Sequence, residues 1–328
     1  TEWSTNEKVA LEGACGAAYT GLRAMATMKQ NGVNVASDIL TAMALAGNPG
    51  GLVLVVCDDP GGISSTNEVD TRNYARLADV PLLEPSTFQE AKDMVRWAFS
   101  LSEELELLCM VRSVTRISHA RGVVELGTIE KIERTPVMKP EQRYGSLPPC
   151  PNHAEVKAKL RRAGEIFENS PFNKYAGPER PELLVLTCGT GWWYSTEAIR
   201  MLGVTDRVGV LKLGTTWPLP EALLKKHLEK ASSVLVIEES DPVLEYNLKA
   251  LLSKEDLKAV APSSVLGKVT GTVQGLYGPG VGEMNPNVVA DAISRALELD
   301  APSLPESLKS SMQGEIDFEI PKREVAFC

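Results

Sequence analysis

Cysteine pairs, basic clusters and long apolar runs are all missing from this sequence of 328 residues. None of the six cysteines stands in a Cys-x-x-Cys pair, so no zinc or iron–sulfur site is complete. The net charge is −9 and the basic residues are scattered, which argues against nucleic acid or a membrane surface as partner. No apolar stretch is long enough to span a membrane. We therefore expect a cytoplasmic protein with reduced cysteines.

The composition is that of an ordinary globular protein, with 43% apolar and 23% charged residues. In the first half, strand-like and helix-like segments alternate, and runs such as GLVLVVC are typical of buried parallel strands. This alternation predicts an α/β fold. The expected strands are 23–27, 51–57 and 107–111, and the expected helices are 8–22, 37–46 and 88–105, the last with Ser86 as N-cap.

A second α/β unit follows a proline-rich stretch that carries one charged helix, expected at 154–168. In this unit we expect a helix from Ser195, after the strand ELLVLTC, and another with Pro220 in its first turn. We predict four parts: a first domain at 1–130, a connector at 131–179, a second domain at 180–300 and a linker at 301–328.

Two loops after strands have the form of ligand sites. Gly189-Thr190-Gly191 begins like a dinucleotide fingerprint, but Tyr194 replaces the third glycine, so a plain strand-to-helix turn is favoured over NAD. Asp58 and Asp59 follow a parallel strand, where α/β sheets bind ligands and where two carboxylates could hold Mg²⁺. A magnesium site and a simple Pro-Gly-Gly loop are equally compatible with these residues.

Four further residues are ambiguous by themselves. Arg72 and Arg76 could bind a substrate carboxylate, but arginines in such a stretch more often face solvent. His119 and His153 have no nucleophile or ligand partner nearby in sequence, so a structural or exposed role is favoured for both.

The stretch STNEKVALEGACGAAYTG places a carboxylate, Glu7, at the head of a helix rich in alanine and glycine. Asn6 and Glu7 could simply cap this helix. The small residues, however, would let another backbone approach closely, and a carboxylate at the end of such a packed helix is partly desolvated and suited to proton transfer.

Several long segments together resemble the large subunit of indolepyruvate:ferredoxin oxidoreductases, in the 2-oxoacid:ferredoxin oxidoreductase superfamily. They include WSTNEKVALEGACGAAYTGLRAMATMKQNGVNVASD, GLVLVVCDDPGGISS, VRSVTRISHAR, VLKLGTTWPLPE and VGEMNPNVVADAI. The resemblance implies a pyrimidine-binding domain that lacks its first β–α unit, followed by a domain like the C-terminal domain of transketolase.

The resemblance also implies roles for particular residues. Glu7, with Asn6 beside it, would contact N1′ of thiamine diphosphate, share a proton with it and so promote activation of C2. Arg76 matches the arginine that binds the substrate carboxylate in related pyruvate enzymes, and Arg72 is its rival. Cys328 would be the first cysteine of an incomplete metal-binding motif.

Other parts of such an enzyme have no counterpart here, since no Gly-Asp-Gly motif for the diphosphate and Mg²⁺ is present. We therefore expect a fragment that works with a diphosphate-binding domain, a ferredoxin-like domain with [4Fe-4S] clusters and a smaller subunit, as a dimer of heterodimers. The whole enzyme would use an aryl 2-oxoacid, coenzyme A and ferredoxin. The alternatives are a non-catalytic assembly subunit, or a thiamine enzyme of the transketolase or 2-oxoacid dehydrogenase type.

Overall fold

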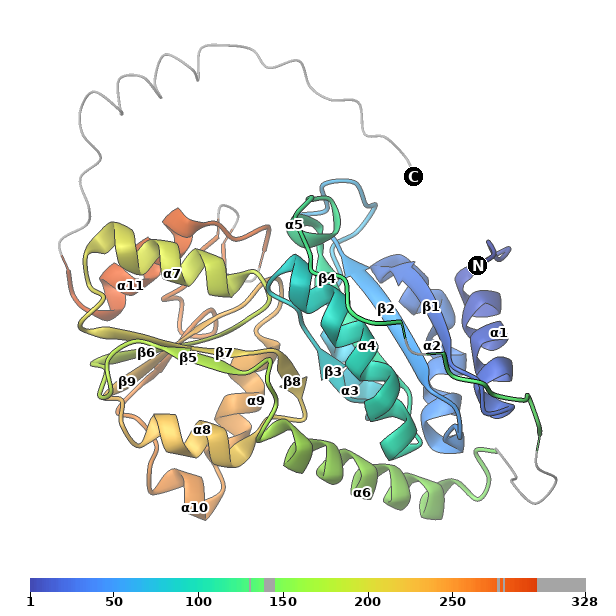
Figure 1. Ribbon diagram of the computed structural model, residues 1–328. Helices are drawn as coiled ribbons and strands as arrows, with labels where there is room; N and C mark the ends of the chain where they lie inside the picture. Colours follow the sequence, from blue (N-terminus) through green and yellow to red (C-terminus); the bar gives the residue numbers. More distant parts are fainter. Residues whose placement is uncertain (130, 139–144, 276–277, 280, 300–328) are drawn as a thin grey trace, which may run out of the picture.

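The computed structural model describes residues 1–129, 131–138, 145–275, 278–279 and 281–299. Figure 1 shows two sheets side by side, each covered by helices. Each has five strands, in the order β1-β2-β4-β3-β8 for the first sheet and β10-β9-β6-β7-β5 for the second. The predicted α/β class is therefore confirmed, whereas the predicted domain boundaries stay a prediction.

The first unit alternates strands and helices along the chain. Its elements are α1 (Glu7–Tyr19), β1 (Ala24–Lys29), α2 (Gln30–Ala46), β2 (Leu52–Asp58), α3 (Arg72–Ala78), β3 (Leu82–Leu83), α4 (Phe88–Leu105), β4 (Cys109–Val114) and α5 (Thr115–Ser118). Strands β1, β2, β4 and β3 run parallel, so their carboxyl ends meet at one edge of the sheet. Loops that follow these strands are therefore the ones that can assemble a site.

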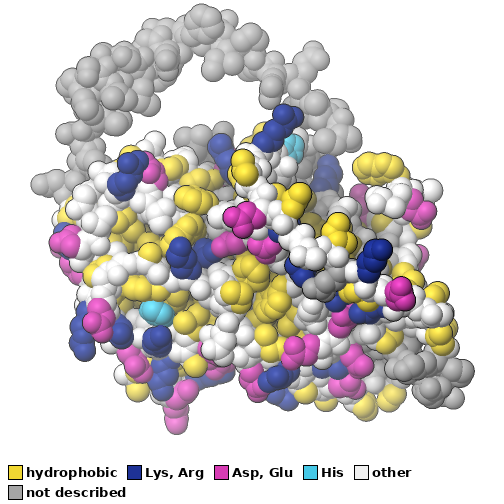
Figure 2. Space-filling model, in the orientation of Figure 1, with side chains coloured by type: hydrophobic (Ala, Val, Ile, Leu, Met, Phe, Trp, Pro, Cys, Tyr) yellow, Lys and Arg dark blue, Asp and Glu magenta, His cyan; other side chains and the backbone are white. Residues whose placement is uncertain are grey.

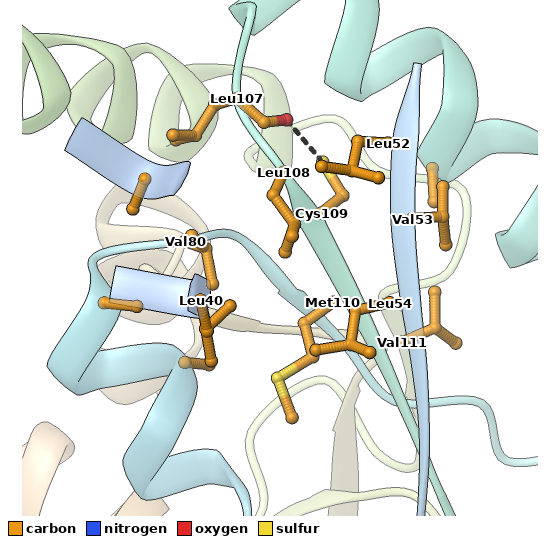
Figure 3. Close-up of a cluster of buried hydrophobic side chains, with 14 of the residues drawn as sticks. Leu40, Leu52, Val53, Leu54, Val80, Leu107, Leu108, Cys109, Met110 and Val111 are labelled. Atoms are coloured by element: carbon orange, nitrogen blue, oxygen red, sulfur yellow. Dashed lines mark hydrogen bonds between the residues drawn. The ribbon is translucent and has the colours of Figure 1, made fainter. Parts of the chain in front are cut away.

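The core of the first unit explains why β2 and β4 lie at the centre of the sheet. Figure 3 shows Leu52, Leu54, Cys109 and Met110 packed among other apolar side chains of this core. All four are fully buried. Cys109 donates a long hydrogen bond, 3.8 Å, to the carbonyl of Leu107. Strands buried on both faces need such continuous apolar runs, and this is the pattern visible in the sequence.

The second unit follows a long connecting helix, α6 (Pro149–Phe167). Its elements are β5 (Lys174–Ala176), β6 (Leu183–Cys188), α7 (Gly191–Leu202), β7 (Val208–Leu213), β8 (Thr215–Trp217), α8 (Glu221–Leu228), β9 (Ser233–Ile237), α9 (Val243–Leu251), α10 (Glu255–Lys258), β10 (Val265–Leu266) and α11 (Pro286–Ala296). Strand β8 leaves this unit and pairs antiparallel with β3 of the first sheet. The two units thus share a strand pairing as well as side-chain contacts.

Five local predictions are corrected by the structure. Helix α2 begins at Gln30 rather than at residue 37, and α7 begins at Gly191 rather than at Ser195. Helix α6 begins at Pro149 rather than at residue 154. The N-cap of α4 is Thr87, whose hydroxyl accepts the Glu90 N–H at 3.0 Å, and not Ser86. Pro220 is the N-cap of α8 and precedes its first turn. Each error is at a helix start, where sequence patterns are least informative.

Helix α1 buries one side within this chain, through Leu11, Ala14, Cys15 and Ala18. The expected close approach of another backbone to its small residues stays a prediction. The two internal glycines, Gly13 and Gly16, face open space. Within the residues described, none of the helices is both long and apolar enough to cross a membrane.

Candidate functional site

Glu7 is the first residue of α1 and its side chain lies across the beginning of α2. A Cβ atom added to Gly32 of α2 would lie 2.4 Å from Cγ of Glu7 and 3.0 Å from its Cδ. Only glycine leaves room for the glutamate there, so the two residues form one local arrangement. Asn6 is the N-cap, since its Oδ1 accepts the Val9 N–H at 3.0 Å. The capping role considered for Asn6 is therefore present in the structure.

Two residues missed at the sequence level begin α2, directly before Gly32. Gln30 is fully buried and its amide nitrogen donates to the carbonyl of Asn67 at 3.4 Å, while its Oε1 has no partner within the described chain. Asn31 donates to Thr66 at 3.2 Å, and its buried Oδ1 also lacks a partner there. Buried acceptors are normally satisfied, so these two oxygens are exceptions among the described residues. The polar Gln-Asn pair directly after a strand was the available signal.

Asp58 and Asp59, at the end of β2, are occupied by donors of the protein itself. Asp58 accepts hydrogen bonds from the N–H and hydroxyl of Thr71 and from Nε of Arg112. Asp59 accepts from the Ser64 N–H at 2.8 Å and from the Thr115 hydroxyl at 2.9 Å. Across the described ranges, no group of three or more His, Cys, Asp or Glu side chains could hold a metal ion. The structure thus favours the loop interpretation over a magnesium site.

Arg72 is completely enclosed where the two units meet. Its side chain pairs with Asp70 and with Glu238, at 2.5 and 2.7 Å, and it also donates to the carbonyls of Glu239 and Asp241. Every nitrogen of its guanidinium group therefore has a partner in the protein. Arg72 joins the two units and presents no free donor to a substrate.

A second buried arginine, Arg112, extends this ion network through Asp58 and Glu84, both at 2.6 Å. Burial alone would raise the pKa of Asp70, but the guanidinium groups of Arg72 and Arg112 outweigh it and lower the pKa to about 2. For Asp58 burial prevails, and its pKa is raised despite Arg112. Burial also raises the pKa of Glu238, with Arg72 opposing it. We call these six residues, Asp58, Asp70, Arg72, Glu84, Arg112 and Glu238, the junction network.

Arg76 lies one turn after Arg72 in α3 but has a different environment. It is exposed, and its guanidinium carbon lies 5.7 Å from the centre of the Trp217 ring. Among the residues that the structure describes, Arg76 forms no salt bridge. It lines a cavity of about 10 Å³ with Arg72, Trp217 and Asn247, which is about the space of one water molecule. Substrate binding by Arg76 stays a prediction.

The remaining candidates lie apart from Glu7. Gly189 and Gly191 flank the turn into α7, where the Thr190 hydroxyl donates to buried Glu239 at 3.0 Å. His153 contacts Asp79 at 3.1 Å, and Lys157 forms an ion pair with the same carboxylate. His119 is exposed and ends α5. Cys328 lies outside the described residues.

Within the described chain, the side chain of Glu7 lies against the start of α2. Arg72 and Arg76, in contrast, contact residues of the second unit, Glu238 and Trp217 respectively. A carboxylate at a helix start can share a proton with a nitrogen base. These residues offer no comparable arrangement for a phosphate group and its metal. The site is therefore suited to one end of a polar heterocycle.

Comparison with curated proteins gives extensive matches, although no family model matches the chain. The indolepyruvate oxidoreductase subunit IorA of Pyrococcus abyssi is 38% identical over 335 residues, which cover 100% of this chain and 50% of that protein. The subunit of the same name from Archaeoglobus fulgidus is 37% identical, with the same two coverages. The chain therefore spans about half the length of the curated relatives it matches.

Two solved structures share the fold at low sequence identity. A 2-oxoglutarate:ferredoxin oxidoreductase from Magnetococcus marinus, with 2-oxoglutarate, coenzyme A and succinyl-CoA bound, is 14% identical with a TM-score of 0.59, over 89% of this chain and 56% of that one. A split-gene transketolase, described as an inactive beta4 tetramer, is 15% identical with a TM-score of 0.57, over 89% and 82% of the two chains. The fold is thus the α/β fold of such enzymes, as predicted.

Proposed function

Because the chain belongs to the indolepyruvate oxidoreductase IorA family, we propose that it supplies part of the active site of a thiamine-diphosphate-dependent 2-oxoacid:ferredoxin oxidoreductase. The complete enzyme would decarboxylate an aryl 2-oxoacid such as indolepyruvate in the cytoplasm, pass the electrons to ferredoxin and form an acyl-CoA. The identity of 37–38% over the whole chain to two IorA subunits supports this proposal. Because the chain spans only half of their length, the activity belongs to a larger assembly.

The observation that carries the proposal is the position of Glu7 over Gly32, at the beginning of α2. In this arrangement Glu7 would share a proton with a ring nitrogen of the aminopyrimidine. Thiamine diphosphate, when bound, supplies a carbon nucleophile for attack on the 2-oxoacid.

The residues that the structure describes do not match the other end of the cofactor. Asp58 and Asp59 are already bonded to protein donors, and no metal-binding cluster occurs in the part of the chain that the structure describes. We therefore assign the Mg²⁺, the diphosphate and the [4Fe-4S] clusters to other parts of the enzyme. The word "subunit" in the names of the relatives supports a separate partner polypeptide as well.

Replacement of Glu7 tests the proposal in the assembled enzyme. Glu7→Gln keeps the shape of the side chain but removes the proton-sharing carboxylate, so we expect turnover to fall by about a hundredfold or more. The rate of C2–H exchange in bound thiamine diphosphate, followed by NMR, measures the same step directly. Glu12→Gln, on the exposed side of α1, is the matched control and should leave both rates unchanged.

The outcome also separates the proposal from a non-catalytic assembly role. If thiamine diphosphate bound to the Glu7→Gln enzyme exchanges its C2 proton at the wild-type rate, then Glu7 has no part in this step. The chain would then serve assembly. A slower exchange with unchanged thermal stability of the variant supports the catalytic assignment.

A further inference from the structure

A long surface segment with no helix or strand follows α5. It comprises residues 120–129 and 131–138, and we call it the strap. Figure 1 shows it running from α5 across α4 and the first sheet toward α1. Three of its apolar side chains are almost fully exposed: Val123 by 98%, Leu126 by 88% and Ile129 by 90%. Large apolar side chains in such a row are costly to leave in water and mark interaction surfaces.

The opposite side of the strap is attached to the protein by specific contacts. Glu125 and Gln89 of α4 are joined twice, since the Glu125 N–H donates to Oε1 of Gln89 at 2.7 Å and the Gln89 amide donates to the Glu125 carbonyl at 3.5 Å. Arg134 donates to the carbonyl of Gly21 at 2.9 Å and pairs with Glu103 at 2.7 Å. The strap is thus held by polar groups while its large apolar side chains point away.

Gly122 shows that the backbone, rather than a side chain, lies against α4. A Cβ atom at Gly122 would be 1.9 Å from the ring of Phe88, so any other residue would lift the strap off the helix. Val123, Leu126 and Ile129 recur at every third position, and all three side chains are almost fully exposed. The fold therefore presents a row of apolar side chains outward. Figure 2 shows yellow side chains at the surface on this face of the molecule.

We propose that the strap is the docking surface for the portion of the IorA-type polypeptide that this chain does not span. One observation selects this occupant. The relatives are about twice as long as the matched region, so a partner portion of similar size exists in the family.

The choice of this occupant rests on the proposed function. Its binding to the strap can nevertheless be measured without any catalytic activity. The contact is of the kind in which a few apolar anchors enter pockets of the partner and carry most of the binding energy. Val123, Leu126 and Ile129 are the anchors.

Co-expression tests the proposal. The tagged chain is produced together with the unmatched portion of the Pyrococcus abyssi relative as a separate polypeptide, and the purified material is analysed by light scattering. We expect a one-to-one complex with the wild-type chain. The triple variant Val123→Asp, Leu126→Asp, Ile129→Asp should recover at least about tenfold less partner. Because these side chains are exposed, its melting temperature should match that of the wild type.

Two controls complete the experiment. Met201→Asp places the same charge on an exposed apolar site of α7 and should leave complex formation unchanged. Glu7→Gln should also leave it unchanged, so failure of the catalytic proposal and failure of docking are separate results. The proposal is overturned if the wild-type chain recovers no partner, if the triple variant recovers as much as the wild type, or if the strap instead drives self-association of this chain.

Discussion

At position 32, the absence of a side chain allows Glu7 to lie across α2. Glycine inside a helix normally costs stability relative to alanine, by about 1 kcal/mol, so its presence in the first turn of a 17-residue helix needs a reason. The distance of 2.4 Å between a hypothetical Cβ and Cγ of Glu7 supplies that reason. Glycine at position 32 therefore makes room for the side chain of Glu7 and does not stabilise α2.

Gly32→Ala should therefore separate stability from activity. The fold should remain intact, because the gain in helix propensity offsets much of the local crowding against Glu7 and Met28. In the assembled enzyme, turnover should fall by about tenfold or more, because the carboxylate is displaced. Urea unfolding and steady-state kinetics measure the two effects.

Gly16→Ala is the matched control, since it lies in α1 with nothing within 4 Å of the added methyl group. It should gain up to about 1 kcal/mol of stability and keep full turnover. Full turnover in Gly32→Ala would mean that the position of Glu7 does not depend on Gly32.

At the scale of elements, the start of α4 shows how two adjacent hydroxyl residues take different roles. Thr87 caps the helix by accepting the Glu90 N–H, and the Glu90 carboxylate in turn accepts the Ser86 N–H at 2.8 Å. The hydroxyl of Ser86 is buried and has no partner among the described residues. The sequence Pro-Ser-Thr-Phe allowed either residue to be the cap, and only the backbone path decides between them.

Thr87→Ala should destabilise the protein by about 1 kcal/mol, the usual cost of a lost N-cap. Ser86→Ala should be neutral or slightly stabilising, because it removes a buried polar group that forms no hydrogen bond. Thermal unfolding of both variants, measured in parallel, checks the pair. Equal destabilisation by the two substitutions would contradict the assignment of Thr87 as the cap.

At the scale of the whole molecule, the junction network connects the two sheets through buried charges. Arg72 bonds to Asp70 of the first unit and to Glu238 of the second. Removing one partner from such a pair leaves an uncompensated charge in a dry place, whose cost exceeds the value of the pair itself. The relative position of the two units therefore depends on these residues together with the pairing of β3 with β8.

Arg72→Ala should lower the free energy of unfolding by about 3–5 kcal/mol. Arg76→Ala, in the same helix but exposed and without a salt bridge among the described residues, should change it by no more than about 0.5 kcal/mol. Urea denaturation measures both values. If Arg72→Ala is stable but reduces kcat/KM for the 2-oxoacid, then Arg72 is the substrate ligand and its structural assignment here is wrong.

The pH dependence of stability should report on Asp70. Its pKa is lowered from 3.8 to about 2 in the folded protein, so its contribution to stability is complete above about pH 4 and is lost as the pH falls toward 2. The raised pKa values of Asp58 and Glu238 act with the opposite sign, and the charge of Asp70 itself contributes to the raised pKa of Asp58. Asp70→Asn should therefore be least stable relative to wild type near neutral pH.

The difference in the free energy of unfolding between the wild type and Asp70→Asn should shrink as the pH falls from about 4 to about 2. Chemical denaturation at a series of pH values follows this difference. A constant gap over that interval would show that ionised Asp70 contributes nothing to the stability of the junction.

The order of strands and helices in each unit was accessible from the sequence because it depends on local patterns. Runs such as GLVLVVC and ELLVLTC are apolar without interruption, and only strands buried on both faces require that. The family resemblance was equally accessible, and the matches to the IorA subunits confirm it.

Only the tertiary structure decided what Arg72, Gly32 and β8 do. Arg72 and Glu238 are 166 residues apart, and no local pattern connects them. The role of Gly32 depends on Glu7 of another helix, and β8 leaves its own unit to pair with β3. The periodicity of apolar residues identifies single helices and strands. It does not specify which distant segments pack against each other in the tertiary structure.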